Sequence, residues 1–303
     1  MAPLIALTGA SGFIGQHIVT ALLDQGFAVR ALSRKAVADR AGVEWVQGSL
    51  DDPQSLLRLV SGATAVVHCA GQVRGGSREV FDRCNVDGTE RLLAAVQQSG
   101  GCERVLVMSS LAARHPQLSW YAQSKLAGER KALEAAGSMA VGIFRPTAVY
   151  GPGDQELHPL FTWMLRGWLA RLGPVDAQLS FLHVLDLAAA VVQWLKAEKP
   201  GSGVYELNDG AVAGYNWSTL RDIGASVRGA PVHLLSIPTP LLRRISSLNL
   251  AWHRLVSAEP MLTPCKVNEL VHNDWSSSNR AISTDIGWAP TVGLHRALQD
   301  RLF

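Results

Sequence analysis

The stretch Thr8-Gly9-Ala10-Ser11-Gly12-Phe13-Ile14-Gly15 joins two patterns of different period. Before it lies a short apolar run, residues 4–7, which is typical of a buried strand. After it, apolar side chains recur with the spacing of one helical face, at Ile14, Ile18 and Leu22. The order of strand, glycine-rich turn and helix is the beginning of a βαβ unit, and it predicts an α/β fold.

The three glycines of this turn suit the binding of a dinucleotide. Gly9 can adopt backbone angles closed to other residues, Gly12 lets the main chain approach a ligand, and Gly15 lets the helix pack closely on the strand. The unpaired N–H groups at the start of the helix form an anion site for a pyrophosphate. The alternative is a glycine turn that binds nothing. We predict cofactor contacts at Gly9, Ser11, Gly12, Phe13, Ile14 and Gly15.

Length and composition suit a globular enzyme. The chain has 303 residues, of which 48% are hydrophobic and 17% charged, enough to bury a substantial core. The formal charge of +3 is small for this length, so no nucleic acid is expected as a partner. Four cysteines lack the spacing of a metal site or a disulfide framework, so we expect no metal. With no apolar run of roughly 18 residues and no room for a signal peptide, we expect a cytoplasmic protein without an integral membrane segment.

The end of the second expected strand, residues 26–35, bears on the choice of cofactor. An NAD site would place an Asp or Glu here for the ribose 2′-hydroxyl, and residues 26–37 contain no acid. Arg34, with Ser33 and Lys35 beside it, offers donors for a 2′-phosphate instead. We therefore predict NADP(H) in preference to NAD(H). The alternative is that Arg34 and Lys35 are only solvated turn charges.

Further alternation of strands and helices predicts a doubly wound parallel sheet, a Rossmann-type α/β fold with helices on both faces. His68, near the end of one expected strand, is expected to be a packed residue rather than a catalyst. Ser109 and Ser110 end another strand, and carboxyl strand ends face the ligand crevice of such a sheet. We expect functional hydroxyls there, with helix capping as the alternative.

Tyr121 and Lys125 lie four residues apart in a stretch with helical spacing, so their side chains share a face. With Ser110 nearby they can form a proton-transfer group. The ammonium of Lys125 would lower the pKa of the tyrosine, and the serine hydroxyl would steady the substrate oxygen. A tyrosine four residues before a lysine is a weak motif by itself, because many surface helices contain one.

The order of these motifs resembles that of the extended short-chain dehydrogenase/reductase family, also called the NAD-dependent epimerase/dehydratase family, over essentially the whole chain. The matching segments are residues 8–15, 85–89, 109–110, 121–125 and 145–153. The resemblance implies Tyr121 as the catalytic acid/base, Lys125 as the residue that binds the nicotinamide ribose and tunes the tyrosine, and Ser110 as the residue that binds the substrate oxygen. Ser109 is the alternative serine.

The resemblance also implies contacts with the cofactor beyond the glycine turn. They fall on Arg34, Leu50, Ala70, Gly71, Asn85, Ser109, Tyr121, Lys125, Pro146, Ala148 and Val149. Ser49 departs from the family, which often has an acid there at the adenosine end. This departure leaves the adenine contacts open.

The same resemblance suggests a division into two interleaved domains. Residues 1–155 form the dinucleotide-binding domain, to which residues 181–204 return, and the rest of residues 156–303 form a smaller C-terminal substrate domain. Within the latter, residues 241–256 carry one apolar stripe, with arginines outside it. We expect an amphipathic cap packed over the active-site cleft; a helix that binds a membrane surface or an anionic partner is the alternative.

The predicted function is that of an NADP-dependent oxidoreductase that moves a hydride between nicotinamide and a carbonyl or secondary alcohol, with Tyr121 carrying the proton. A mainly apolar small-molecule substrate is favoured by the large side chains in the segments expected to cover the nicotinamide, namely Trp163, Met164, Trp168, Leu241, Leu242 and Trp252.

Two other functions stay open. A sugar-nucleotide epimerase or dehydratase would need a diphosphate clamp, which could come from Arg166, Arg171, Arg243 and Arg280. Thr147 argues against it, because many such enzymes of this family carry an asparagine there. A non-catalytic NADP-binding protein would have no chemical need for Ser110, Tyr121 and Lys125. The helices after residue 85 and around Tyr121 could form the two-fold interface of a homodimer, and a monomer is equally compatible with the sequence.

Overall fold

The computed structural model of the chain describes residues 2–256 and 262–303. Its centre is a seven-stranded sheet in the order β10-β6-β5-β4-β1-β2-β3, with every neighbouring pair parallel. The strands are β1 (Leu4–Thr8), β2 (Ala28–Ser33), β3 (Val43–Gln47), β4 (Ala65–His68), β5 (Arg104–Met108), β6 (Ala140–Pro146) and β10 (Gly203–Leu207). The strand order reverses at β1, so the predicted doubly wound parallel sheet is confirmed.

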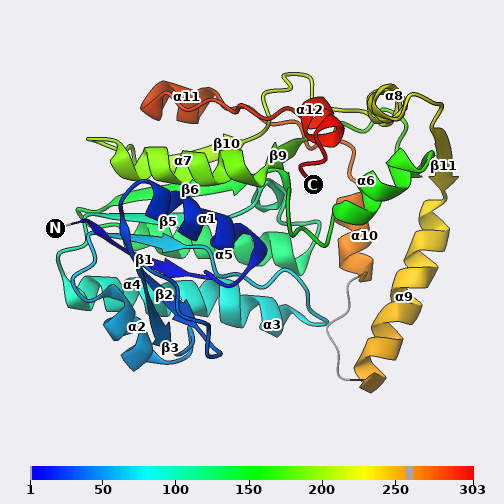
Figure 1. The fold of residues 1–303 in the computed structure, drawn as a ribbon. Coiled ribbons are helices and arrows are strands. Elements are labelled where there is room, and N and C mark those ends of the chain that lie inside the picture. The colour runs from blue at the N-terminus through cyan, green and yellow to red at the C-terminus, as the bar shows by residue number, and fades with distance from the viewer. Residues whose placement is uncertain (1, 257–261) are drawn as a thin grey trace.

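Helices cover both faces of this sheet (Figure 1). Alternate residues of β1 point to opposite sides: Ile5 and Leu7 belong to one buried cluster and Ala6 to another. The first cluster includes α1 (Phe13–Asp24), α7 (Val184–Lys196) and α11 (Arg280–Ile286); the second includes α2 (Pro53–Val60), α4 (Gly88–Ser99) and α5 (Trp120–Glu134). Leu7 is fully buried, so Leu7→Ala should cost about 2–5 kcal/mol of stability.

The carboxyl ends of the central strands lead into the segments that form the site. The glycine turn leads from β1 to α1, and a loop leads from β4 to α3 (Arg78–Asp82), which continues through a π-helical turn, η1 (Arg83–Asp87), into α4. The end of β5 passes through a 3-10 turn, η2 (Leu111–Arg114), to α5. These connections place the predicted motifs along one edge of the sheet.

A second lobe lies beside that edge (Figure 1). Its described residues form two small parallel sheets, β7 (Ala148–Tyr150) with β9 (Phe181–His183) and β8 (Trp168–Leu172) with β11 (His233–Ile237). They also form the helices α6 (His158–Leu165), α8 (Trp217–Arg228), α9 (Thr239–Val256), α10 (Pro264–Leu270) and α12 (Leu294–Gln299). Tyr150, Phe161 and Leu220 are among its buried core residues. The chain returns to the main sheet through α7 and β10, and the proposed domain boundaries stay a prediction.

The helix α9 differs from the amphipathic cap that we expected. Leu241, Ile245 and Leu248 of the predicted stripe are 49%, 45% and 71% exposed, whereas Leu242 and Ser246 on another side are buried. The expectation that the stripe packs over the cleft is therefore wrong for these three residues, because a periodic pattern defines a face without saying what covers it. Trp252 and Leu255, which continue the stripe, have side chains outside the described part.

Candidate active site

The glycine turn has a geometry that only glycine permits at two of its positions. Gly9 has a φ of +75°, and a Cβ there would lie 2.6 Å from the backbone nitrogen of Ala70. At Gly15 a Cβ would lie 2.0 Å from the carbonyl oxygen of Gly9. At Gly12 the nearest atom would be that same oxygen, at 3.4 Å, so the space beside Gly12 is open. These roles agree with those inferred from the sequence.

The start of α1 suits an anion. No side chain caps the helix at Gly12, and its first turn carries no acidic residue. The first backbone N–H groups therefore keep their donor capacity, and the positive end of the helix dipole is not neutralised. Open space beside Gly12 and uncapped donors together fit the pyrophosphate of a dinucleotide cofactor. Ser11 is exposed beside this turn, Phe13 is half-buried, and Ile14 packs against the core.

Arg34 lies exposed directly after β2. Ser33 donates to the carbonyl oxygen of Lys35 at 2.8 Å, which closes the turn and occupies the serine hydroxyl. The Arg34 guanidinium makes no hydrogen bond or ion pair within residues 2–256 and 262–303, and its charge is one of those that oppose the raised pKa of the Cys84 thiol. The Arg34 charge thus lies near enough to act on Cys84 of η1.

Asn85 connects the loop after β4 to α5. Its side-chain oxygen accepts from the Gln72 backbone N–H at 2.8 Å, and its side-chain nitrogen donates to the Gln72 carbonyl at 3.0 Å and to the Ser124 hydroxyl at 2.9 Å. A Cβ at Gly128 would lie 2.3 Å from the Asn85 carbonyl oxygen, so α5 packs directly on η1. Asn85 positions two elements of the site here, and its predicted contact with the cofactor stays a prediction.

His68 takes part in a buried chain of hydrogen bonds. The Thr89 hydroxyl donates to the Asn85 carbonyl and lies 3.0 Å from Nε2 of His68. Nε2 therefore carries a proton and donates a hydrogen bond to the Thr89 oxygen. Nδ1 then accepts from the Thr8 hydroxyl at 2.7 Å, which itself accepts from the Ala70 N–H. Burial, followed by the charge of Lys125, lowers the pKa of His68 to about 3. His68 is a neutral packing residue, as we expected.

The two serines after β5 have different surroundings. Ser109 is buried and donates to the carboxylate of Glu129, which is also paired with Arg145. Ser110 accepts from the Ala112 N–H at 3.2 Å at the start of η2, and a hydrogen bond with Ser110 lowers the pKa of Tyr121. Ser110 therefore faces the tyrosine, whereas the Ser109 hydroxyl is engaged with a buried ion pair.

Lys125 and Tyr121 stand one turn apart on α5. The Lys125 ammonium donates to the Met108 carbonyl at 2.6 Å, and burial lowers its pKa. A Cβ added to Gly71 would lie 3.4 Å from this ammonium, which places Lys125 under the loop after β4. Tyr121 and Lys125 thus lie at the carboxyl edge of β4 and β5, where family resemblance expects the nicotinamide.

The pKa of Tyr121 is raised by burial, and two groups oppose this increase. One is the hydrogen bond with Ser110, and the other is the charge of Lys266, whose ammonium lies 5.9 Å from the centroid of the Tyr121 ring. We expected Lys125 to supply this charge. In the structure it is Lys266 of α10, a residue that the sequence did not single out, that acts on the phenol.

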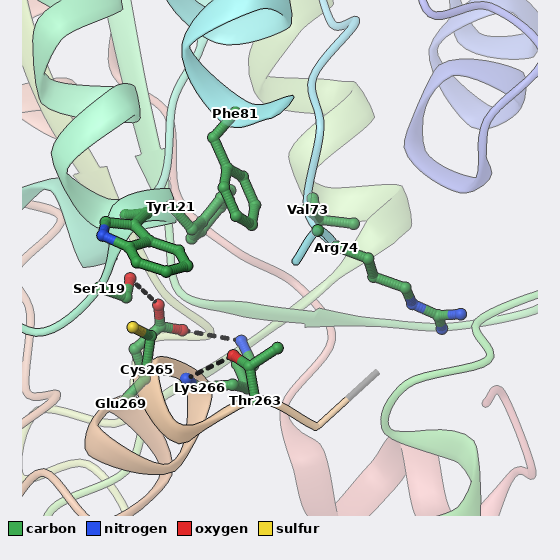
Figure 2. A pocket seen from close by; sticks show the side chains of 11 residues that line it. Val73, Arg74, Phe81, Ser119, Tyr121, Thr263, Cys265, Lys266 and Glu269 are labelled. Atoms are coloured by element: carbon green, nitrogen blue, oxygen red, sulfur yellow. Dashed lines mark hydrogen bonds and ion pairs between the residues drawn. The ribbon is translucent and has the colours of Figure 1, made fainter. Parts of the chain in front are cut away.

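A pocket lies between the start of α5 and α10 (Figure 2). Val73, Phe81 and Trp120 give it apolar walls, and the rings of Phe81 and Tyr121 lie 6.2 Å apart. The remaining lining residues are Arg74, Gly75, Ser119, Tyr121, Thr263, Cys265, Lys266 and Glu269. Figure 2 shows the Glu269 carboxylate between Ser119 and Lys266.

The pocket contains other residues than those that the sequence suggested. Trp163, Trp168 and Leu241 are exposed, and none of them lines it. Met164 and Leu242 are buried elsewhere in the second lobe. These five residues therefore do not line this pocket, because composition does not show which side of an element faces the cleft. Their place over the nicotinamide stays a prediction, and the Trp252 side chain lies outside the described residues. None of the four arginines considered for a diphosphate clamp lines the pocket either: Arg166, Arg171, Arg243 and Arg280.

The other predicted cofactor contacts are placed as follows. Leu50 lies against Gly88, where a Cβ would meet it at 2.8 Å. Pro146 ends β6 opposite Leu207 of β10. Ala148 and Val149 follow in β7, exposed and half-buried respectively. Their contacts with a cofactor stay predictions.

Comparison with known proteins identifies the class of protein that this fold and site define. The chain belongs to the NAD dependent epimerase/dehydratase family, whose model matches residues 5–207. It is therefore an oxidoreductase-type enzyme of the extended short-chain dehydrogenase/reductase group, and the family resemblance inferred from the motifs is confirmed. Its cofactor is a nicotinamide dinucleotide.

Several relatives align over almost the whole chain, and two of them are reductases. The ceramide reductase of Caulobacter vibrioides is 35% identical over 97% of this chain and 95% of its own length. The 2-alkyl-3-oxoalkanoate reductase of Stenotrophomonas maltophilia is 28% identical over 97% of each. Among solved structures, the UDP-glucuronic acid 4-epimerase of Bacillus cereus, with UDP-glucuronic acid and NAD, covers 98% of this chain and 96% of its own with a TM-score of 0.74. At 19% identity this last similarity concerns the fold.

Proposed function

We propose that this enzyme is an NADP(H)-dependent reductase of a carbonyl group, or dehydrogenase of the corresponding secondary alcohol, in a mainly apolar, lipid-like molecule. The observation that carries the proposal is the pairing of the cations in the pocket beside Tyr121. Arg74 is held by Glu156, with Nε 2.9 Å from the carboxylate, and Lys266 is held by Glu269 at 2.8 Å. Within the described lining neither cation is left for a diphosphate, while the walls are apolar.

The relatives support the same substrate class. One is named for the reduction of a ceramide and the other for that of a 2-alkyl-3-oxoalkanoate, and both of these molecules carry alkyl chains. Neither name includes a nucleotide. A substrate of this kind would lay its alkyl part against Val73, Phe81 and Trp120 and direct its oxygen toward Tyr121.

The residues of the site divide the chemistry between them. A bound nicotinamide supplies the hydride for reduction or accepts it in oxidation. Tyr121 donates its phenolic proton to the substrate oxygen in reduction and takes the proton back in oxidation, so one hydride and one proton convert the carbonyl into the alcohol. Ser110 holds that oxygen by a hydrogen bond, and Lys125 binds the nicotinamide ribose from beneath the loop after β4.

The preference for NADP(H) rests on Arg34. Its guanidinium is exposed at the end of β2, the strand that neighbours β1, and is not engaged by any described acid. A 2′-phosphate could accept two parallel hydrogen bonds from it, whereas the hydroxyl of NAD(H) would call for an acid that residues 26–37 lack.

The deciding assay follows NADPH absorbance with two sets of compounds, hydrophobic ketones and aldehydes in one and nucleotide sugars in the other. We expect oxidation of NADPH by members of the first set and none by the second. Conversion of a nucleotide sugar without net change in NADPH, together with silence on every carbonyl compound, would assign the function to an epimerase instead. Tight NADPH binding without turnover of either set would leave a non-catalytic binding protein.

A further inference from the structure

The helix α9 has two sides of opposite character. Leu242 and Ser246 are 7% and 0% exposed and form its packed side. Leu241, Ile245 and Leu248 recur at intervals of four and three residues, and at 49%, 45% and 71% exposure they form an apolar ridge on its outer side. A ridge of three large aliphatic side chains costs solvation free energy when it faces water, so it marks a surface that meets another apolar phase.

The charge around this ridge has one sign. Residues 157–175 and 223–256 contain no aspartate or glutamate, although they include α6, β8, β11 and all of α9. Arg243 and Arg244 are exposed directly beside the ridge, and Arg166 and Arg228 are exposed on the neighbouring elements. The surface is therefore apolar and basic at once, without an acid in these segments to neutralise it.

Large apolar side chains are also exposed on three other elements of this lobe, namely β11, β8 and α6. The strand β11 leads into α9 along the border of the molecule farthest from the main sheet (Figure 1). Leu235 of β11 and Trp168 of its partner strand β8 are exposed at 49% and 44%. Trp163 of α6 is 56% exposed, and the Arg166 guanidinium lies 5.7 Å from its ring. Exposed tryptophan beside arginine is a combination suited to the headgroup region of a bilayer.

From this combination we propose that the outer side of α9, with Leu241, Ile245, Leu248, Arg243 and Arg244, docks on the surface of a bilayer that contains anionic lipid. The three aliphatic side chains enter the boundary between headgroups and acyl chains, and the two guanidinium groups meet lipid phosphates. A second copy of the chain suits the surface less well, since a two-fold contact would bring like-charged arginines together. No helix within the described residues is long and apolar enough to span a bilayer. The attachment that we propose is a peripheral one.

Docking at α9 would also place the substrate pocket near the bilayer, a step that rests on the proposed function. The helix α9 contacts α10, and α10 supplies Cys265, Lys266 and Glu269 to the pocket beside Tyr121. A lipid-like substrate could then reach the pocket along α10 without crossing bulk water, where its alkyl chains are poorly soluble.

The test is flotation of the full-length enzyme with vesicles, which measures binding without any substrate. One set of vesicles consists of phosphatidylcholine alone and the other of phosphatidylcholine with phosphatidylglycerol. We expect binding to the anionic vesicles, weakened by salt. Arg243→Gln with Arg244→Gln should weaken it by roughly fivefold for each arginine removed. Replacing Leu241, Ile245 and Leu248 by serine should abolish it, because the apolar anchor is lost.

Control variants test exposed residues of the same types elsewhere. Val212→Ser, at a 95% exposed position, and Arg130→Gln on α5 should leave vesicle binding unchanged. Unchanged NADPH binding and thermal unfolding would show that the α9 variants fold. Equal binding to both vesicle sets, or binding that survives the α9 changes, overturns the proposal. If the unmodified enzyme binds no vesicles and the serine variant has a lower molar mass in solution than the unmodified enzyme, the surface is instead a contact between copies of the chain. Failure of the carbonyl assay would leave the flotation result intact.

Discussion

The Lys266 ammonium lies 5.9 Å from the centroid of the Tyr121 ring, although the two residues come from different lobes. Glu269 holds this ammonium at 2.8 Å, and the same carboxylate accepts from Ser119 at the start of α5. A positive charge at this distance stabilises the phenolate, and the carboxylate opposes it. The acidity of the predicted proton donor thus depends on α10, which also lines the pocket beside Tyr121.

The first prediction concerns this dependence. Lys266→Met removes the cation and leaves Glu269 beside the phenol, so the pKa of Tyr121 should rise further. Reduction requires the protonated tyrosine, so kcat/KM falls along a limb at high pH. In Lys266→Met this high-pH limb should move to higher pH. Lys266→Arg should keep the position of that limb, and Glu269→Gln should move it to lower pH. Profiles of kcat/KM against pH measure these shifts; a limb unmoved in Lys266→Met would remove Lys266 from this role.

The second prediction concerns the proton itself. Tyr121→Phe should bind NADPH normally and lose turnover by roughly 10²-fold or more, the usual share of general acid–base catalysis. Lys125→Met should impair both, because we assign it to the ribose as well. Calorimetry and single-turnover rates separate the two effects. Undiminished turnover of the phenylalanine variant would exclude Tyr121 as the acid.

The third prediction concerns cofactor preference. Arg34→Ala should weaken NADPH binding by roughly 10- to 100-fold, the range of a hydrogen bond to a charged group, and leave NADH binding nearly unchanged. Arg130→Ala, an exposed arginine of α5, serves as the matched control. Calorimetric titration with both cofactors measures the effect, and equal affinities in the unmodified enzyme would refute the preference.

The fourth prediction separates two glycines of the same turn. A Cβ at Gly12 would meet only the Gly9 oxygen, at 3.4 Å, whereas one at Gly15 would lie 2.0 Å from it. Gly12→Ala should therefore melt like the unmodified enzyme but lose affinity for NADPH, since the methyl group would occupy the space beside the helix start. Gly15→Ala should melt at lower temperature even without cofactor. Thermal unfolding with and without NADPH tests both; normal cofactor affinity of the Gly12 variant would contradict our placement of the pyrophosphate.

The fifth prediction concerns stability against pH. His68 has its pKa lowered from 6.5 to about 3, so the folded state stays neutral where the unfolded chain binds a proton. The contribution of the neutral ring is complete above about pH 6.5 and is lost as the pH falls toward 3. The free energy of unfolding should fall with decreasing pH more steeply than in His68→Gln, by up to about 1.4 kcal/mol per pH unit. Denaturant titrations at several pH values measure this slope, and the exposed His233→Gln should keep it.

The sequence predicted the parts of the fold that depend on local patterns. The glycine turn, the apolar strands and the spacing of Tyr121 and Lys125 each lie within a few residues, and their periods reflect secondary structure directly. Ser110 rather than Ser109 faces Tyr121, because adjacent residues of an extended chain point to opposite sides. The sequence alone does not show which of the two sides faces the site.

The parts that the sequence did not reveal depend on contacts between distant segments. Nothing in residues 263–269 resembles a motif, and only the folded chain brings Lys266 and Glu269 beside Tyr121. Likewise the periodicity of α9 predicted an apolar stripe correctly, but the neighbours of a helix decide which side is covered. The residues that line a pocket are determined by tertiary structure, so residue composition alone did not identify them.

The Ser119 hydroxyl accepts a hydrogen bond from the Ala122 N–H at 2.9 Å and donates a hydrogen bond to the Glu269 carboxylate. One hydroxyl therefore closes the first turn of α5 and fastens that turn to α10. A shift of α10 that widened the pocket would break this hydrogen bond and disturb the turn on which Tyr121 stands. We therefore expect a molecule too large for the pocket to react slowly as well as to bind weakly, because a contact that limits the pocket also helps to align the acid.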